Sequence, residues 1–296
     1  IDIGSKKEKI KTRTIYKFRI LTYSSSFFIC MLIICINIMI FLNSQFIHKL
    51  TPKQALAQLK FNQWNEQKGK YVILDTETIG LYDKQICDIA IIDLDGNVIF
   101  ESLVRPKDPI PEDSTKIHGI TNEMVKDDPI FPEVWPKIFP IIKGKTILIY
   151  NSQFDIGALG DSLESWDAPE DYFNEYFELK SECVMKTYAD LVNSKWLKLS
   201  EAVGREISYR AVNDCFATLE VGKKSYNPKF TQKDCDLICL CAEIEKISKR
   251  IRYLDYQIKE LQEEQSELLT KQKKLFHQLF TGKIEKEETH WTESEV

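Results

Sequence analysis

Short apolar runs alternate with polar, turn-forming residues in the first half of the chain, and this pattern predicts β-strands. We expect strands at residues 70–76, 86–94, 97–104 and 146–151. Asp95 and Gly96 separate the second run from the third, and this pair is typical of a tight hairpin turn. The second and third strands are therefore expected to pair as a hairpin.

Longer segments with helical spacing precede and follow these strands. Residues 51–68 are amphipathic, with Thr51 as a cap and Pro52 in the first turn. Further helices are expected at 133–142, where Pro136 and Pro140 should interrupt the helix, from residue 154 onward, and over 209–224. Residues 160–208 give a mixed pattern. Strands that come first and then alternate with helices predict an α/β fold with a mixed sheet flanked by helices.

Beyond residue 230 the apolar residues follow a heptad repeat. Thr231 and Asp234 frame a capping box where this helix begins. The two sets of core positions are Ile244, Ile251, Ile258, Gln265, Gln272 and Leu279, and Ile247, Leu254, Leu261, Leu268 and Leu275. Isoleucine at one position and leucine at the other favour a parallel two-stranded coiled coil over residues 231–281.

The partner of this coiled coil is left open by the sequence. Arg250 and Asp255 stand at positions that pair between chains, and a homodimer is the simplest arrangement. Another coiled-coil partner is the alternative, as is one long helix folded back on the domain. The tail over residues 282–296 is charged and is expected to be disordered.

The first 48 residues are basic and then apolar, and they allow three interpretations. Residues 26–42 could form a membrane anchor, and the seven Lys and Arg residues before them would keep the N-terminus in the cytoplasm. The six cysteines that follow show no disulfide framework, which favours a reducing, cytoplasmic compartment. The segment could instead be a non-native extension, or an apolar helix buried elsewhere.

Composition and charge exclude some classes of protein. A length of 296 residues fits one globular domain with extensions or two small domains. The net charge of −5 excludes a basic nucleic-acid coat, so any nucleic-acid contact must be local or carried by metal ions. Eight cysteines without a CxxC pair, and only four histidines, argue against a zinc site. Cys235, Cys239 and Cys241 are expected to be free thiols.

Four carboxylates stand at the ends of apolar elements. Asp75 and Glu77 are two residues apart at the end of a strand, so they share one face. Asp155 follows the strand at 146–151, and Asp214 interrupts an apolar helix stripe. Buried like charges repel one another, and a hard divalent cation removes that cost. The set suits two Mg²⁺ or Mn²⁺ ions and phosphoryl transfer.

Four motifs then carry a resemblance to a known family. LDTETIG (74–80), IHGIT (117–121), YNSQFD (150–155) and YRAVNDCFAT (209–218) resemble, in order and spacing, the DEDD-type 3′–5′ exonucleases. This family includes the proofreading epsilon subunit of bacterial DNA polymerase III. The match covers about residues 69–224, and we assign an exonuclease domain to residues 69–226, after a leading helix over 49–68.

The resemblance implies a ribonuclease H-like fold and removal of nucleotides from the 3′ end of DNA or RNA. It implies that Asp75, Glu77, Asp155 and Asp214 are the acidic metal ligands. It also implies contacts with the terminal nucleotide from Thr78, Ile79, Gly80, His118, Asn151 and Phe154. For two of these a structural role stays open, since His118 could brace Gly119 and Asn151 could hold its turn.

Tyr209 departs from the family pattern. The histidine subgroup has its histidine five residues before the last aspartate, where this chain has Tyr209. An imidazole can take a proton from the attacking water at neutral pH, whereas a phenol, which ionises near pH 10, does so poorly. Tyr209 could orient the water, the base could come from elsewhere or from the ions alone, or the domain could bind 3′ ends without cutting. The intact acids favour an active enzyme over an end-binding scaffold that dimerises through its coiled coil.

Overall fold

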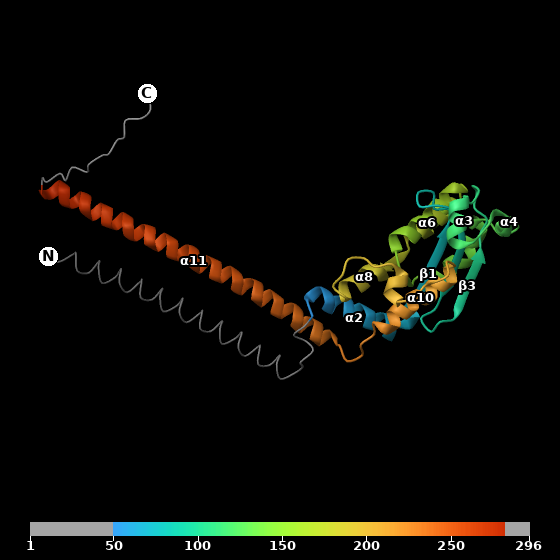
Figure 1. Ribbon diagram of the computed structural model, residues 1–296, viewed down its shortest axis with the longest axis horizontal. Helices are drawn as coiled ribbons and strands as arrows, with labels where there is room; N and C mark the ends of the chain where they lie inside the picture. The colour runs from blue at the N-terminus through green and yellow to red at the C-terminus, as the bar shows by residue number, and fades with distance from the viewer. Residues whose placement is uncertain (1–49, 282–296) are drawn as a thin grey trace, which may run out of the picture. The chain divides into compact units, whose positions relative to one another are not determined.

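The computed structural model describes residues 50–281 (Figure 1). The predictions for residues 1–48, including the segment 26–42, and for the tail 282–296 lie outside the described residues. Residues up to Cys239 form one compact unit, and the residues from Leu240 form a second. Between residues 50 and 281, no helix combines the length and the apolar character that crossing a membrane requires.

A five-stranded mixed sheet forms the centre of the first unit. Its strands are β1 (Tyr71–Thr78), β2 (Ile86–Ile92), β3 (Val98–Leu103), β4 (Thr146–Ile149) and β5 (Lys180–Cys183), in the spatial order β3-β2-β1-β4-β5. The pairs β1–β2 and β2–β3 are antiparallel, whereas β1–β4 and β4–β5 are parallel. The predicted mixed sheet is confirmed. The sequence did not reveal β5, because KSEC is polar and short.

The predicted hairpin between β2 and β3 is also confirmed. The Asp93 carboxylate accepts hydrogen bonds from the backbone N–H groups of Asp95, Gly96 and Asn97 at 2.8–2.9 Å. Gly96 has a φ of +100°, a conformation that favours glycine. This turn fixes the register of β2, the strand that lies beside β1.

Helices cover both faces of the sheet (Figure 1). Val72 and Leu74 of β1 pack in a core with α5 (Phe131–Ile142), α6 (Ser152–Ser165) and α7 (Glu170–Phe177). Tyr71 and Ile73 pack in a second core on the opposite face. That core includes α2 (Pro52–Glu66), α8 (Val184–Leu191), α9 (Leu199–Val203) and α10 (Ala211–Lys224). The short elements are η2 (Lys68–Lys70), α3 (Glu112–His118) and α4 (Asn122–Val125).

Helix α5 corrects one expectation. It runs unbroken over Phe131–Ile142, although Pro136 and Pro140 lie inside it. Both prolines are on the exposed side of the helix, where water can bond to the carbonyls that lose their N–H partners. The opposite side is wholly buried and includes Val134, Trp135 and Ile138. Burial of this apolar side therefore outweighs the two lost hydrogen bonds.

The leading helix α2 is built into the same unit as the sheet. It begins at the predicted cap, where Thr51 and Gln54 form a capping box. Its buried Asn62 donates to the carbonyls of Asn227 and Phe230 at 2.6 and 2.7 Å and accepts from the N–H of Asn227 at 2.9 Å. Helix α2 thus holds the segment that leads from α10 into the last helix.

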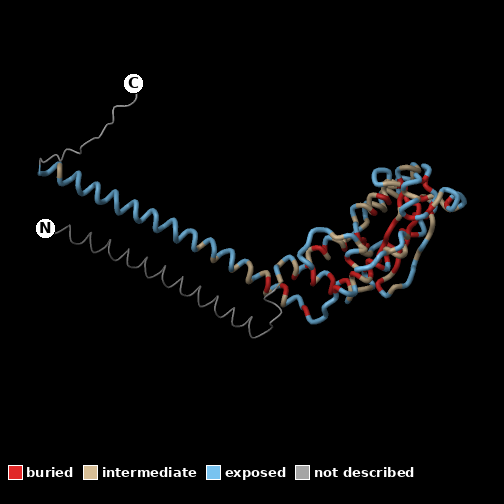
Figure 2. Tube along the Cα trace, viewed as in Figure 1, coloured by how far each residue is buried: buried red, intermediate tan, exposed pale blue. Residues whose placement is uncertain are grey.

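The last helix, α11, is a single helix over Gln232–Thr281. It begins at the predicted capping box, in which Thr231 and Asp234 bond each other. Cys235 and Ile238 in its first turns are buried against Ala55. From Leu240 onward nearly every residue is exposed or half-buried (Figure 2). The long helix is confirmed, and its pairing into a coiled coil stays a prediction.

Candidate active site

Strand β1 brings two acids to the end of a buried run. Asp75 and Glu77 lie two residues apart and so share the face of the sheet on which α10 packs. Asp75 is only 9% exposed, and Glu77 is partly buried. The apolar residues that precede them hold the strand in the core, so the two carboxylates at its end are partly shielded from water.

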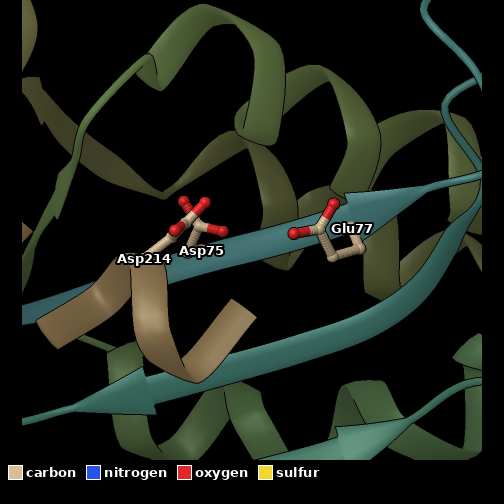
Figure 3. A group of neighbouring side chains, drawn as sticks. All are labelled: Asp75, Glu77 and Asp214. Carbon is tan, nitrogen blue, oxygen red and sulfur yellow. The ribbon is translucent and has the colours of Figure 1, made fainter. Parts of the chain in front are cut away.

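Helix α10 adds the third acid. Asp214 lies in its first turn and reaches the same place above β1 (Figure 3). One carboxylate oxygen from each of Asp75, Glu77 and Asp214 lies within 4.8 Å of the other two. Residues separated by almost 140 positions in the sequence are therefore brought together by the packing of one helix on the sheet.

Burial and mutual repulsion make it unfavourable for all three carboxyl groups of this cluster to be ionised at once. Burial raises the pKa of Asp75 well above its usual range, and the carboxylates of Asp155 and Asp214 raise it further. Burial, and then Asp214, raise the pKa of Glu77 to about 8. Burial also raises the pKa of Asp214. Without a compensating cation the three groups would not all be ionised at neutral pH.

The fourth predicted acid lies beside the cluster but does not join it. Asp155 is in the first turn of α6, on the opposite face of the sheet, and is 4% exposed. Its Oδ1 accepts hydrogen bonds from the Thr76 backbone N–H at 3.1 Å and from the Thr76 hydroxyl at 2.8 Å. Burial raises the pKa of Asp155 to about 7 despite these bonds. Asp155 is thus anchored one residue away from Asp75.

The sequence analysis missed a fifth acid, Asp88. It lies on β2 directly opposite Glu77 and is fully buried. Its Oδ2 accepts from Arg210 Nε at 2.6 Å and from the N–H of Ala211 at 3.3 Å. The signal was present in ICDIAII, where one acid stands in a strand whose every other residue is apolar.

Tyr209 lies outside the helix that was predicted to begin with it. Helix α10 begins at Ala211, and the extended Arg210 precedes it. Tyr209 is 54% exposed. A helical residue would be fixed at a set angle to Asp214, whereas Tyr209 precedes the helix and its angle to Asp214 is not set by helical geometry.

The residues predicted to contact substrate surround the end of β1 and the start of α6. The Thr78 hydroxyl donates to the Gly80 carbonyl at 2.9 Å, which tightens the turn after β1, and Ile79 is buried. Asn151 is exposed immediately before α6, and Phe154 has the Lys84 ammonium 5.9 Å from its ring centre.

His118 is buried at the end of α3. Its Nδ1 accepts from the N–H of Ile120 at 3.1 Å, across Gly119, which has a φ of +75°. Burial lowers the pKa of His118, which favours the neutral ring. This contact supports the bracing role, and a contact with substrate stays a prediction, as it does for the other five residues.

The three clustered carboxylates fit a divalent metal ion. Carboxylate oxygens are the ligands that Mg²⁺ and Mn²⁺ prefer. Among residues 50–281, no lysine, arginine or histidine forms an ion pair with Asp75, Glu77 or Asp214. Buried charges of one sign need a counter-charge, and a cation is the one that this donor set can hold.

The mixed sheet places acids at the end of its central strand, β1, and the family match identifies this arrangement as an exonuclease, a phosphodiester hydrolase. Residues 72–221, half of the chain, match the RNase_T family, whose description is "Exonuclease". The chain belongs to this family and is a 3′–5′ exonuclease of the DEDD type.

Two relatives are similar in sequence. The chain is 31% identical over 181 residues to the "Uncharacterized exonuclease CP81" of Escherichia phage 186, covering 56% of this chain and 92% of the phage protein. It is 36% identical over 103 residues to the DNA polymerase III subunit epsilon of Pasteurella multocida (strain Pm70), covering 31% of this chain and 40% of the subunit.

The similar solved structures include "Exonuclease X in complex with 5' overhanging duplex DNA". Its sequence is 26% identical, and the match covers 57% of this chain and 99% of that chain with a TM-score of 0.40.

Proposed function

We propose that this exonuclease uses Asp75, Glu77, Asp155 and Asp214 to hold two Mg²⁺ or Mn²⁺ ions at the 3′ end of a nucleic acid. The observation that carries the proposal is the cluster of three buried or partly buried carboxylates that form no ion pair with a basic residue among the described residues. Asp155 is the fourth ligand in this proposal, because its anchor on Thr76 places it next to Asp75.

Bound divalent ions supply two effects, stabilisation of charge on the phosphate and a lower pKa of the attacking water. The protein's own contribution is to fix the ligands. The ladder between β1 and β2 holds Asp75 and Glu77, the first turn of α10 holds Asp214, and Thr76 holds Asp155. Rigid ligands need no rearrangement when charge develops on the phosphate, so the site is organised before substrate arrives.

Tyr209 takes the place of the general base in this proposal. It stands where the histidine subgroup has its histidine, and its exposed ring lies in a loop at the entrance to α10. A phenol is a poor base at neutral pH, but its hydroxyl can accept a hydrogen bond and so orient the water. We therefore expect real but slow hydrolysis.

The substrate is a nucleic acid with a free 3′ end. Thr78, Ile79 and Gly80 form the turn that would approach the terminal nucleotide, and His118 lies behind that turn. Asn151 and Phe154 flank it from the start of α6, where Lys84 brings a positive charge within reach of a phosphate. Hydroxyl, amide and backbone groups of this kind can approach either sugar, so DNA and RNA are both candidate substrates.

The direct test uses the full chain and single strands of DNA and RNA about 20 nucleotides long. Products are followed from a 5′ label with Mg²⁺, with Mn²⁺ and with a chelator. The variants are Asp75→Ala and Tyr209→His, with Asp127→Ala as a control, since Asp127 is exposed and away from the cluster.

We expect a ladder that shortens from the 3′ end, requires the metal, is lost in Asp75→Ala and is retained in Asp127→Ala. Tyr209→His should be roughly ten times faster near neutral pH, because a positioned imidazole is a better base. A slower Tyr209→His would show that the tyrosine has a role that histidine cannot take. No cleavage by the parent with either metal would contradict the proposal and leave a protein that binds nucleic-acid ends.

We also propose that α11 pairs with a second copy of the chain as a parallel coiled coil. The supporting observation is a row of exposed apolar side chains at heptad spacing, including Ile247, Leu254 and Leu268 at 52%, 41% and 59% exposure. Arg250 and Asp255 would pair between the two chains. Sedimentation of the full chain tests this, and a monomeric mass at micromolar concentration would contradict it.

A further inference from the structure

One buried charge in the first unit has no part in the proposed metal set. Asp88 lies opposite Glu77 in the β1–β2 ladder and is fully buried. Its Oδ1 is buried without a hydrogen-bond partner, and its Oδ2 accepts from two donors. A buried carboxylate that could be replaced by an apolar residue costs stability, so its position calls for a reason.

The two donors to Asp88 belong to the entrance of α10. Arg210 Nε donates to Oδ2 at 2.6 Å, and the N–H of Ala211, the first residue of α10, donates to the same oxygen at 3.3 Å. The second nitrogen group of the guanidinium lies 3.9 Å from Glu101 of β3. One carboxylate of the sheet therefore fixes both the side chain and the backbone where this helix begins.

The chain of bonds continues to the metal cluster. The carbonyl of Arg210 accepts from the N–H of Asp214 at 3.2 Å and from the N–H of Asn213 at 2.9 Å. Asp214 is thus joined through Arg210 to Asp88, and Asp88 faces Glu77 across the ladder. Tyr209 is the residue immediately before Arg210, so the same pair sets where its backbone lies.

We propose that Arg210, held by Asp88, is a positioning residue that fixes Asp214 against Asp75 and Glu77 for metal binding. The inference rests on the proposed function, because the position that Arg210 and Asp88 give to Asp214 matters for metal binding only if the carboxylates hold metal. Arg210 is also the residue that forms the ion pair with Asp88, and without it a buried anion would remain beside Glu77. Groups that orient a metal ligand typically change affinity or activity about 10–100-fold when they are removed.

A second arginine offers a matched control. Arg205 Nη2 bonds Glu220 Oε2 at 2.9 Å and so also ties a loop to α10, but at residues outside the cluster. If an ion pair with α10 mattered only for stability, the loss of either arginine would have similar consequences.

The test compares the full-length parent with Arg210→Ala, Arg210→Lys, Asp88→Asn and Arg205→Ala. Mn²⁺ binding is measured without substrate from the electron paramagnetic resonance signal of the free ion. Circular dichroism follows folding, and kcat and KM are measured on a 3′-ended single strand at saturating metal. Arg210→Lys keeps the charge but loses the planar head that bonds Asp88, so it separates charge from position.

We expect Arg210→Ala to keep its helical signal and to bind Mn²⁺ at least about tenfold more weakly. The loss should be smaller in Arg210→Lys and Asp88→Asn, and absent in Arg205→Ala. The kcat should fall while KM changes little. If Arg210→Ala does not fold, the Mn²⁺ affinity of Arg210→Lys tests the inference instead.

The inference would be overturned if Arg210→Ala and Arg210→Lys both bound Mn²⁺ within twofold of the parent. It would also be overturned if Arg205→Ala lost as much Mn²⁺ affinity as Arg210→Ala. A parent that binds Mn²⁺ but cuts nothing would contradict the proposed function and leave the positioning role to be judged by affinity. A parent that does neither would overturn both.

Discussion

The acidic cluster and helix α11 reverse the usual distribution of residues in opposite ways. The cluster buries carboxylates, and α11 exposes leucine and isoleucine. A buried charge is costly unless a counter-charge compensates it, and a continuous exposed apolar stripe is typical of a surface that binds a partner. Each region therefore suits the partner proposed for it, a cation for the acidic cluster and a second helix for α11.

The two regions differ in how they are assembled. The cluster takes Asp75 and Glu77 from β1 and Asp214 from α10, so it exists only when the unit is folded. The stripe on α11 comes from one helix with one period, so any helical conformation of that segment displays it. Unfolding of the first unit should therefore abolish metal binding by the cluster but leave the apolar stripe of α11 able to pair.

The largest expected effect comes from Asp75→Asn. We expect a loss of about 1,000-fold or more in kcat, equivalent to about 4 kcal/mol, because a ligand charge is removed. The metal-free variant should at the same time be more stable than the parent, since folding no longer has to raise the pKa of a buried carboxyl at this position. Both quantities are measured on one preparation, by nuclease assay and by thermal melting in chelator. A variant that is both inactive and less stable would indicate that Asp75 is needed for folding.

The next largest effect is expected at Asn62, where α2 holds residues 227–230. Asn62→Ala removes the four hydrogen bonds of a side chain that is 2% exposed, one of them with Gln58 of the same helix, so the free energy of unfolding should fall by about 2–3 kcal/mol. Chemical denaturation measures this change. The exposed Gln63→Ala on the same helix is the control and should change little. Equal effects at the two positions would argue against a specific anchor.

A smaller effect is expected on association through α11. Leu268→Glu places a charge on the apolar stripe and should weaken the dimer at least about tenfold, as burial of an unpaired charge predicts. Thr270→Glu places the same charge two residues away and off the heptad core, and it should leave the dimer intact. Analytical ultracentrifugation distinguishes them, and the nuclease rate per chain should be unchanged in both. A dimer that survives Leu268→Glu would contradict the predicted seam.

The smallest expected effect is a pH dependence of the metal-free protein. Burial raises the pKa values of the clustered acids when the chain folds, that of Glu77 to about 8 from an ordinary value of 4.5. The folded state therefore holds more protons than the unfolded state between about pH 4 and pH 8, so stability falls as pH rises through this window. We expect the melting temperature to decrease by several degrees from about pH 5 to pH 8 in chelator. Added Mg²⁺ or Mn²⁺ should remove the decrease, and a flat profile in chelator would contradict the predicted burial of charge.

Sequence patterns alone determined the local elements and the chemistry of the candidate site. Short apolar runs gave β1 to β4, the Asp95–Gly96 pair gave the hairpin, and the heptads gave α11, because each of these depends on neighbours within a few residues. Motif order gave the family, since Asp75, Glu77, Asp155 and Asp214 fall at its spacing. The sequence could not reveal β5, which owes its strand conformation to pairing with β4.

Tertiary structure decided which of these residues meet. Pro136 and Pro140 remain within α5 because the core buries the opposite side of the helix, a gain that local rules do not include. Asp155 stands apart from the other three acids because the backbone N–H and the hydroxyl of Thr76 donate hydrogen bonds to it on the far face of the sheet. Asp88 and Arg210 are 122 positions apart in the sequence and form an ion pair in the folded unit. Tyr209 lies outside α10 because that helix begins at Ala211, whose N–H donates to Asp88. Contacts between distant residues depend on how helices pack on the sheet, and the spacing of residues along the chain does not encode that packing.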